Sequence, residues 1–326
     1  MNFGTIQVAN IFVGTLNAID AYFGTEKVWG KSEPATPNWL CFTAQEANST
    51  VAMKANGSAP TVSLEYSTDG RTWNQFVVGT TTVTLANIGD KMYMRATGAG
   101  NIRMGSSMSD YNQFVMTGKI SASGNVNTLL DQNGNATLTN YCYSYLFGEC
   151  ESLTTAPELP ATTLADGCYY GMFWRCGSLT TAPVLPATTL ANRCYNGMFS
   201  RCLALASAPE LPATTLANYC YNNLFYNCTS LTTAPELPAT TLAESCYSNM
   251  FNNCTSLTTA PELPATTLTL AVNCYSNMFS GCTSLTIAPA LPATKVTKRC
   301  YYNMFSKCSN LNTIKLGYTG KFATAP

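Results

Sequence analysis

Cysteine is the residue type whose number and spacing in this sequence could support chemistry. Fifteen cysteines occur among 326 residues, and fourteen of them form seven pairs whose members are eight residues apart. A thiolate can bind a metal ion, attack an electrophile or form a disulfide. The pairs begin at Cys142, Cys168, Cys194, Cys220, Cys246, Cys274 and Cys300, and the unpaired cysteine is Cys41.

The spacing within each pair argues against a metal site or a disulfide formed by its two cysteines. We expect each pair to lie on a helix, where eight residues correspond to a rise of about 12 Å. That distance is too long for two ligands of one metal ion, and for a disulfide, whose Cα atoms lie within about 7 Å of each other. Disulfides between neighbouring copies are the alternative, although they would be strained. We predict buried free thiols that pack as small hydrophobic side chains, with no metal site and no cofactor.

The other side chains do not form a catalytic set. The chain contains no histidine, which removes the commonest general base and the commonest zinc ligand. The sequence displays no nucleophile–base pair and no phosphate-binding loop, so we predict that the protein is not an enzyme and has no catalytic residues. Seventeen basic residues balance seventeen acidic residues. A nucleic-acid-binding protein would carry a basic excess, so we expect no nucleic-acid partner.

Glutamate recurs at one position of the repeated unit, directly before Leu-Pro. The position is occupied by Glu158, Glu210, Glu236 and Glu262. In a stack of copies, neighbouring glutamates would lie roughly 4.8 Å apart, where like charges repel. We expect these side chains to splay into solvent, and a shared calcium ion is the alternative.

The paired cysteines belong to a repeat with five intervals of 26 residues and one of 28. The unit is Cys-Tyr-x-x-Met-Phe-x-x-Cys-x-Ser-Leu-Thr-x-Ala-Pro-x-Leu-Pro-Ala-Thr-Thr-Leu. Its Cys, Met and Cys at i, i+4 and i+8 would share one face of a helix, and Ser-Leu-Thr favours a short strand that ends at proline. A fixed period of this size is typical of a solenoid. We therefore expect an α/β solenoid of seven units, each with one strand and one helix.

The unit resembles the BspA-like leucine-rich repeats of bacterial surface proteins. The matching steps are Phe173 to Cys176, Cys176 to Leu179, and the Leu-Pro that follows. The resemblance covers residues 142–312 and implies a leucine-rich-repeat fold with a role in adhesion. Cys-Tyr replaces the usual Ile-Gly before the helix, and the unit is slightly longer than the common one. The segments 115–120 and 123–125 that lead into the repeats are similar to those in proteins of gut Bacteroides and their phages.

The part of the chain before the repeats predicts β-structure. Residues 1–33 carry a Gly-Thr motif every ten residues, which indicates three short strands, too few for an independent core. This segment is similar to parts of phage structural proteins, and we interpret it as a docking or oligomerisation segment; a meander packed on the next domain is the alternative. Residues 121–141 would cap the solenoid, and residues 313–326 would form a C-terminal cap or tail.

Residues 38–120 have the pattern of a β-sandwich, with strands about 8–12 residues apart. Asp69-Gly70 predicts a hairpin turn, after which Trp73 folds back on the sheet. This turn resembles those of discoidin-like and Asp-box modules, and we interpret it as structural, with a ligand contact as the alternative. The strand candidates are residues 38–43, 51–54, 62–67, 73–78, 81–85, 91–96 and 113–120.

Positions at which the copies differ are the candidates for recognition. The tyrosine and phenylalanine that recur in every copy are expected to form packing ladders. Several residues that do not recur are of the types that binding surfaces favour. We predict one binding patch on neighbouring helices, and scattered exposed aromatic residues are the alternative. The predicted patch consists of Tyr145, Tyr170, Trp174, Arg175, Arg201 and Tyr226.

These features predict a multidomain protein with an all-β N-terminal part followed by the solenoid. We expect it to act in adhesion or recognition without catalysis. We expect a phage or prophage protein located in the virion, in a tail or head fibre, that binds a host cell-surface protein or glycan. Residues 1–33 would bind other virion subunits, and a homo-oligomer would suit a fibre. The alternatives are a bacterial cell-surface adhesin without its leader and a structural decoration subunit. No secretory signal and no apolar run long enough to span a membrane are visible.

Overall fold

The computed structural model describes residues 20–23, 26–30, 38–266 and 271–314. The chain separates into two compact units, Met1–Asn38 and Trp39–Pro326. In the first unit, β1 (Asp20–Phe23) pairs in antiparallel fashion with β2 (Glu26–Gly30). All three Gly-Thr dipeptides, at residues 4–5, 14–15 and 24–25, and most of the predicted C-terminal cap lie outside the described residues.

Two sheets form the N-terminal part of the second unit. One has the strand order β11-β10-β3-β8-β5-β6, and the other has the order β7-β4-β9. Each of the seven predicted strands overlaps an observed one, so the prediction of an all-β N-terminal part is confirmed. The strands are β3 (Leu40–Ala44), β4 (Ser49–Asn56), β5 (Leu64–Ser67), β6 (Asn74–Phe76), β7 (Thr82–Leu85), β8 (Lys91–Ala96), β9 (Tyr111–Thr117), β10 (Ile120–Ser123) and β11 (Leu153–Thr155).

Alternating residues of the strands build the core between the two sheets. On β8, Met92 and Met94 are buried, and on β4, Val51 and Met53 are buried, while their neighbours are more exposed. This period of two is the pattern that a half-buried strand requires. Burial of each such side chain contributes about 1.5–3 kcal/mol to folding.

The expected helices are absent from the described repeats, so the prediction of an α/β unit is wrong in its helical part. Each Cys-Tyr-x-x-Met-Phe-x-x-Cys segment is instead a ribbon of consecutive turns, which we call the turn ribbon. Every fourth residue of a turn ribbon has positive φ, as at Asn223 (54°), Asn249 (56°) and Asn277 (54°). Asparagine and glycine tolerate this conformation best, which explains their frequency at these positions. Across the described residues, no helix is long and apolar enough to cross a bilayer.

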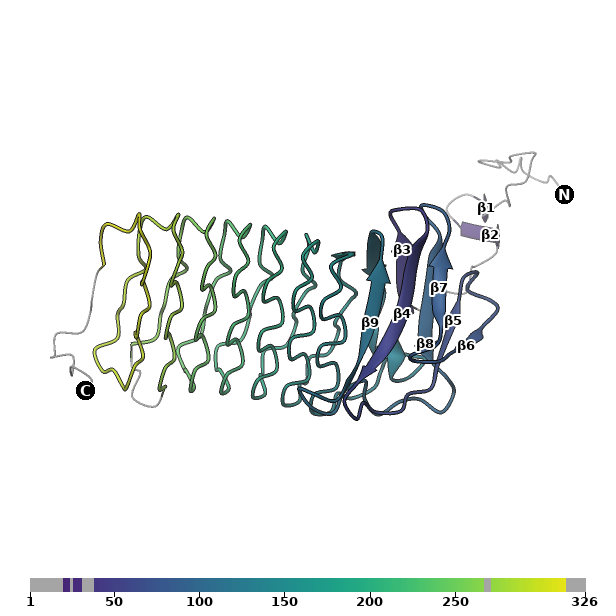
Figure 1. Ribbon diagram of the computed structural model, residues 1–326, viewed down its shortest axis with the longest axis horizontal. Helices are drawn as coiled ribbons and strands as arrows, with labels where there is room; N and C mark the ends of the chain where they lie inside the picture. Colours follow the sequence, from purple (N-terminus) through teal and green to yellow (C-terminus); the bar gives the residue numbers. More distant parts are fainter. Residues whose placement is uncertain (1–19, 24–25, 31–37, 267–270, 315–326) are drawn as a thin grey trace. The chain divides into compact units, whose positions relative to one another are not determined.

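Neighbouring copies are joined through their backbones. The Phe225 N–H donates to the Met250 oxygen of the next copy (3.0 Å), whereas the Cys228 N–H donates back to the Phe225 oxygen within its own turn ribbon (3.1 Å). Successive N–H groups along a turn ribbon therefore alternate between an acceptor in the next copy and an acceptor in the same turn. The N–H groups that bond across to a neighbouring copy all donate to the following copy. Figure 1 shows the copies as successive coils.

Two rows of bridging residues, most of them threonine, join the copies at two further places. The first copy forms the predicted Ser-Leu-Thr strand as β11. In most of the other described copies, a single parallel bridge takes the place of this strand. One row contains the bridges Thr155–Thr181, Ser207–Thr233, Thr233–Thr259 and Thr259–Ile287, and the other contains Thr163–Thr189, Thr189–Thr215 and Thr215–Thr241.

The first copy continues both sheets of the sandwich (Figure 1). On one side, β10 pairs in parallel with β11. On the other side, the Phe114 N–H of β9 donates to the Leu146 oxygen of the first turn ribbon (2.8 Å). A 3-10 helix, η1 (Val126–Leu129), lies buried after β10. The sandwich thus takes the place that a preceding copy would have, and the sandwich and the repeats share one core.

Candidate recognition surface

The cysteines are free, and all are buried except Cys308, which is half-buried. The second cysteine of a pair donates its Sγ–H to a phenylalanine oxygen of the preceding copy, as from Cys176 to Phe147 (3.0 Å) and from Cys228 to Phe199 (3.1 Å). Burial raises the pKa of Cys168 from the ordinary 9.0 to about 12. The prediction of buried packing thiols is confirmed, although the geometry differs from the helix on which it was based.

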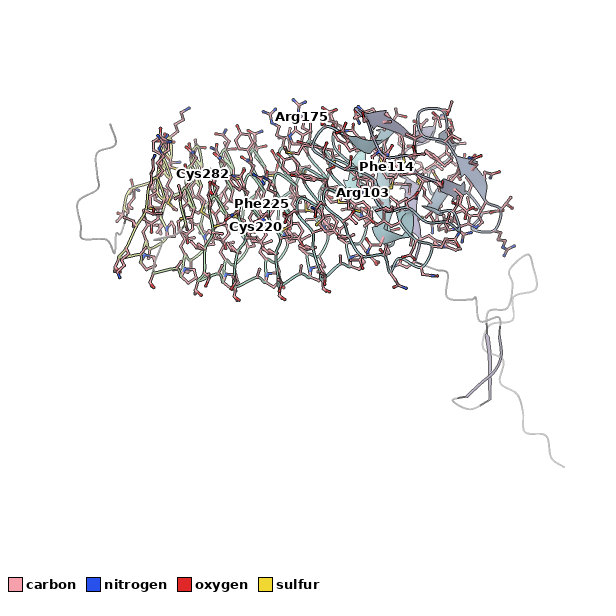
Figure 2. The ribbon with its side chains drawn as sticks, turned by 90° about the horizontal axis from the view of Figure 1, so that it is seen from below. Arg103, Phe114, Arg175, Cys220, Phe225 and Cys282 are labelled. Carbon is pink, nitrogen blue, oxygen red and sulfur yellow. The ribbon has the colours of Figure 1, made fainter. Side chains whose placement is uncertain are left out.

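The recurring aromatic residues are also packing residues, as predicted. Tyr195 and Tyr221 stack at 6.0 Å with planes 4° apart, and Phe199 and Phe225 stack at 5.7 Å with planes 5° apart. These rings are at most 1% exposed. Figure 2 shows Cys220 and Phe225 inside the stack, whereas Arg175 lies at its outer edge. A recognition surface must therefore be sought among the residues that vary between copies.

Four of the six predicted patch residues lie together. The Tyr145 ring lies 5.5 Å from the Tyr170 ring and 5.9 Å from the Trp174 ring, both edge-to-face. The Arg175 guanidinium lies over the Trp174 ring at 4.8 Å. Arg175 is exposed, and the three rings are half-buried, so each is held by neighbours and still offers surface to a ligand.

Three residues that the sequence analysis missed extend this group. Tyr111 of β9 lies 4.9 Å from Tyr145, and Tyr141 lies 6.4 Å from Tyr170. Glu149 pairs with Arg175 at 3.4 Å. Tyr111 could not be placed from the repeat pattern because it comes from the sandwich. We call the whole group the junction cluster: Tyr111, Tyr141, Tyr145, Glu149, Tyr170, Trp174 and Arg175.

Arg201 and Tyr226 lie on later copies. The Arg201 N–H donates to the Tyr226 oxygen at 2.7 Å, which links the third and fourth turn ribbons through the backbone. Within the described part of the chain, neither side chain makes a ring contact with the junction cluster. Arg201 occupies the position of Arg175 in the directly following copy. Arg201 and Tyr226 stay outside the ring contacts of the cluster, and the single patch remains a prediction.

The junction cluster is aromatic, polar and close to neutral. Burial raises the pKa of Tyr145, and the neighbouring Tyr170 raises it further. Burial and the negative charge of Glu149 raise the pKa of Tyr111. These hydroxyls therefore stay protonated at neutral pH and are available as hydrogen-bond donors. Rings of this kind beside an Arg–Glu pair suit the faces of sugars or the side chains of a protein partner.

A pair of glycine variants tests how tightly the cluster is packed. Gly171 and Gly197 occupy the same position in adjacent copies, with φ of 57° and 62°. A Cβ on Gly171 would lie 2.5 Å from Tyr145 Cε1, whereas a Cβ on Gly197 would have nothing within 4 Å. We expect Gly197→Ala to cost about 1–2 kcal/mol through its φ, and Gly171→Ala to cost about 1–3 kcal/mol more because Tyr145 must move. Chemical denaturation measures both, and equal losses would mean that Tyr145 is loosely held.

A second aromatic group lies on the outer face of the six-stranded sheet. The Arg95 guanidinium lies over the Trp73 ring at 3.7 Å and the Trp39 ring at 4.8 Å, and its Nε donates to Glu65 Oε1 at 2.7 Å. Asp69 Oδ1 accepts the N–H groups of Arg71 and Thr72, so the predicted turn is structural. Arg95 covers the ring faces, and we assign this group to holding the hairpin on the sheet.

A pocket of about 660 Å³ opens in the sandwich beside β5 and β6. Pro60, Val62, Phe76 and Val78 are among its lining residues, and Glu65, its charged residue, is already paired with Arg95. The lining contains no cysteine and no pair of carboxylates. Groups of three or more Cys, Asp or Glu placed to hold a metal ion do not occur in the described ranges.

The comparisons with known proteins match the repeats. Residues 218–322 match the family described as BspA type Leucine rich repeat region, in six copies. This supports the predicted leucine-rich-repeat resemblance for that part of the chain, and the family is consistent with adhesion or recognition. No curated protein matches the chain, and no solved structure matches it.

Proposed function

We propose that the protein is a non-catalytic recognition protein that binds a cell surface through the junction cluster. The observation that carries this proposal is the gathering of five half-buried aromatic residues, one arginine and one glutamate at the start of the repeats. Tyrosine, tryptophan and arginine supply most of the binding energy at protein interfaces. Leucine-rich repeats commonly bind proteins, which agrees with this role.

The backbone beneath the cluster is held firmly. The Tyr145 N–H donates to the Tyr170 oxygen (2.9 Å), and the Glu149 N–H donates to the Trp174 oxygen (2.7 Å). The Arg175 N–H donates to the Ser200 oxygen of the next copy (2.8 Å). A surface held in place before binding loses little conformational entropy when a ligand arrives, which supports a recognition role.

We further propose that the seven copies act as one solenoid in a phage or prophage virion, as a fibre protein that binds a gut Bacteroides host. Residues 1–33 would attach it to other virion subunits, and the fibre would be a homo-oligomer. The resemblance of the repeats to surface adhesins supports the host contact, and the Gly-Thr motifs support the attachment. A bacterial cell-surface adhesin and a decoration subunit are the alternatives, and immunogold labelling of particles and cells separates the three.

The receptor is proposed to be a cell-surface protein or glycan. Fluorescent full-length protein is expected to bind intact Bacteroides cells in a saturable manner, with strain preference. Protease treatment of the cells would remove binding to a protein receptor, and periodate treatment would remove binding to a glycan. Absence of saturable binding across a broad strain panel would contradict the host-binding proposal.

A further inference from the structure

The stack of copies has a direction, because the N–H groups that leave each turn ribbon point to the next copy. The Tyr275 N–H donates to the Cys300 oxygen and the Phe279 N–H to the Met304 oxygen, each at 3.0 Å. The last described turn ribbon, residues 299–307, has the same alternation. We call it the terminal ribbon. Its N–H groups at 299, 301, 303, 305 and 307 have no acceptor among the described residues.

This polarity excludes two ways in which a second molecule could extend the stack. Two terminal ribbons cannot pair with each other, because each presents N–H donors. A terminal ribbon cannot pair with the first turn ribbon of another molecule, because the sandwich occupies that side: the Met104 N–H donates to the Cys142 oxygen and the Phe114 N–H to the Leu146 oxygen. The terminal ribbon therefore suits groups that accept hydrogen bonds without donating them, and carboxylates have this property.

The charge around the terminal ribbon is positive. After Glu262 the sequence contains six basic residues and no acidic residue. Lys298, Arg299 and Lys307 are exposed, and they make no ion pair with any residue that the structure describes. Aligned N–H groups add a partial positive charge, as they do at the start of a helix. Four of these six basic residues lie in the described part of the chain: Lys295, Lys298, Arg299 and Lys307.

A complementary surface lies on the flank of the same stack. Glu210, Glu236 and Glu262 occupy one position in three consecutive copies, and all three are exposed. We call them the acidic stripe. The sequence contains no Lys or Arg between Arg201 and Lys295 to balance them. Like charges in neighbouring strands repel, so an approaching cationic surface would relieve the repulsion.

We propose that the terminal ribbon of one molecule binds the acidic stripe of a second copy. The stripe supplies negative charge for Lys298, Arg299 and Lys307, and carboxylate acceptors for the N–H groups that have no acceptor among the described residues. The chain has a formal net charge of zero, so long-range repulsion does not oppose the approach of the two molecules. Because the two surfaces differ, a bound pair keeps one free terminal ribbon and one free acidic stripe, and the contact generates open chains.

Charge reversal in the full-length protein tests the contact by sedimentation velocity. One variant carries Lys298→Glu, Arg299→Glu and Lys307→Glu, and the other carries Glu210→Lys, Glu236→Lys and Glu262→Lys. We expect the unaltered protein to associate with rising concentration in 0.1 M salt and to dissociate in 1 M salt, where the screening length falls from about 10 Å to 3 Å. Each variant alone should be monomeric, and an equimolar mixture of the two should associate again.

The matched control reverses three exposed basic residues of the sandwich, Lys54→Glu, Arg71→Glu and Lys91→Glu, and should associate like the unaltered protein. Circular dichroism melts check that every variant is folded. The proposal is overturned if the unaltered protein is monomeric in 0.1 M salt, as it would be if another part of its own chain covered the terminal ribbon. It is also overturned if the mixed variants stay monomeric, if stripe reversal leaves association intact, or if the control dissociates.

Discussion

Raising the pH from 8 to 10.5 is expected to lower the free energy of unfolding by more than about 5 kcal/mol. Burial raises the pKa of Cys168, Cys228, Cys246 and Cys282 from 9.0 to about 12 in the folded protein. Because the folded pKa lies above the unfolded one, stability is complete below about pH 9 and falls as the pH rises towards 12. Each such thiol costs about 1.4 kcal/mol for each pH unit in this window.

Guanidinium titrations at pH 8, 9, 10 and 10.5, with reductant present, measure this loss. Replacing Cys228 by alanine should reduce the slope of stability against pH in the upper part of the range, even though the variant is less stable at pH 8. Return to pH 8 should restore the signal, which separates ionisation from covalent damage. Constant stability between pH 8 and 10.5 would show that the thiols ionise as readily in the folded protein as in the unfolded chain.

Phe225→Ala is expected to lower the free energy of unfolding by about 3–5 kcal/mol. The ring is 0% exposed and stacks at 5.7 Å on Phe199 on one side and on Phe251 on the other. Truncation leaves a cavity between copies, and each copy in a stack is stabilised by its direct neighbours. The change therefore weakens two interfaces in the middle of the repeats, where Figure 2 labels the residue.

Tyr226→Ala is the matched control for Phe225→Ala. Tyr226 is the next residue along the chain, is also aromatic, and is half-buried. We expect it to cost about 1 kcal/mol or less, as is usual for substitutions outside the core. Denaturant melts followed by circular dichroism compare the two variants, and similar losses would contradict the assignment of the recurring phenylalanines to the core.

The strands of the sandwich could be predicted because each alternates buried and exposed residues, as at Met92 and Met94 of β8. The turn ribbons could not, because a spacing of four residues between Cys168, Met172 and Cys176 suits a helix face and a chain of four-residue turns equally well. The informative signal was the asparagine or glycine at the middle positive-φ position of every turn ribbon after the first, since both residues are poor helix formers. Gly197, Asn223 and Asn249 occupy this position in three consecutive copies.

The sequence predicted most of the part of the junction cluster that lies on the repeats, but not the part that the sandwich contributes. Residues that differ between copies are not required for packing of the stack. This criterion identified Tyr145, Tyr170 and Trp174. It could not locate Tyr111, because the junction depends on long-range pairing of the sandwich with the first copy, and such pairing leaves no local pattern. It also did not show which side chains touch, and among the described residues Arg201 and Tyr226 make no ring contact with the junction cluster.

The most direct test of the proposed recognition surface compares two double variants on the same cells. Tyr145→Ala with Trp174→Ala removes the centre of the junction cluster, whereas Tyr226→Ala with Tyr302→Ala removes two aromatic rings elsewhere on the repeats. The binding isotherm of each fluorescent protein is measured after its melting curve shows that it is folded at the assay temperature. The first variant should bind at least about tenfold more weakly, equivalent to about 1.4 kcal/mol, and the second should bind like the unaltered protein. Equal binding by the two variants would contradict recognition through the junction cluster.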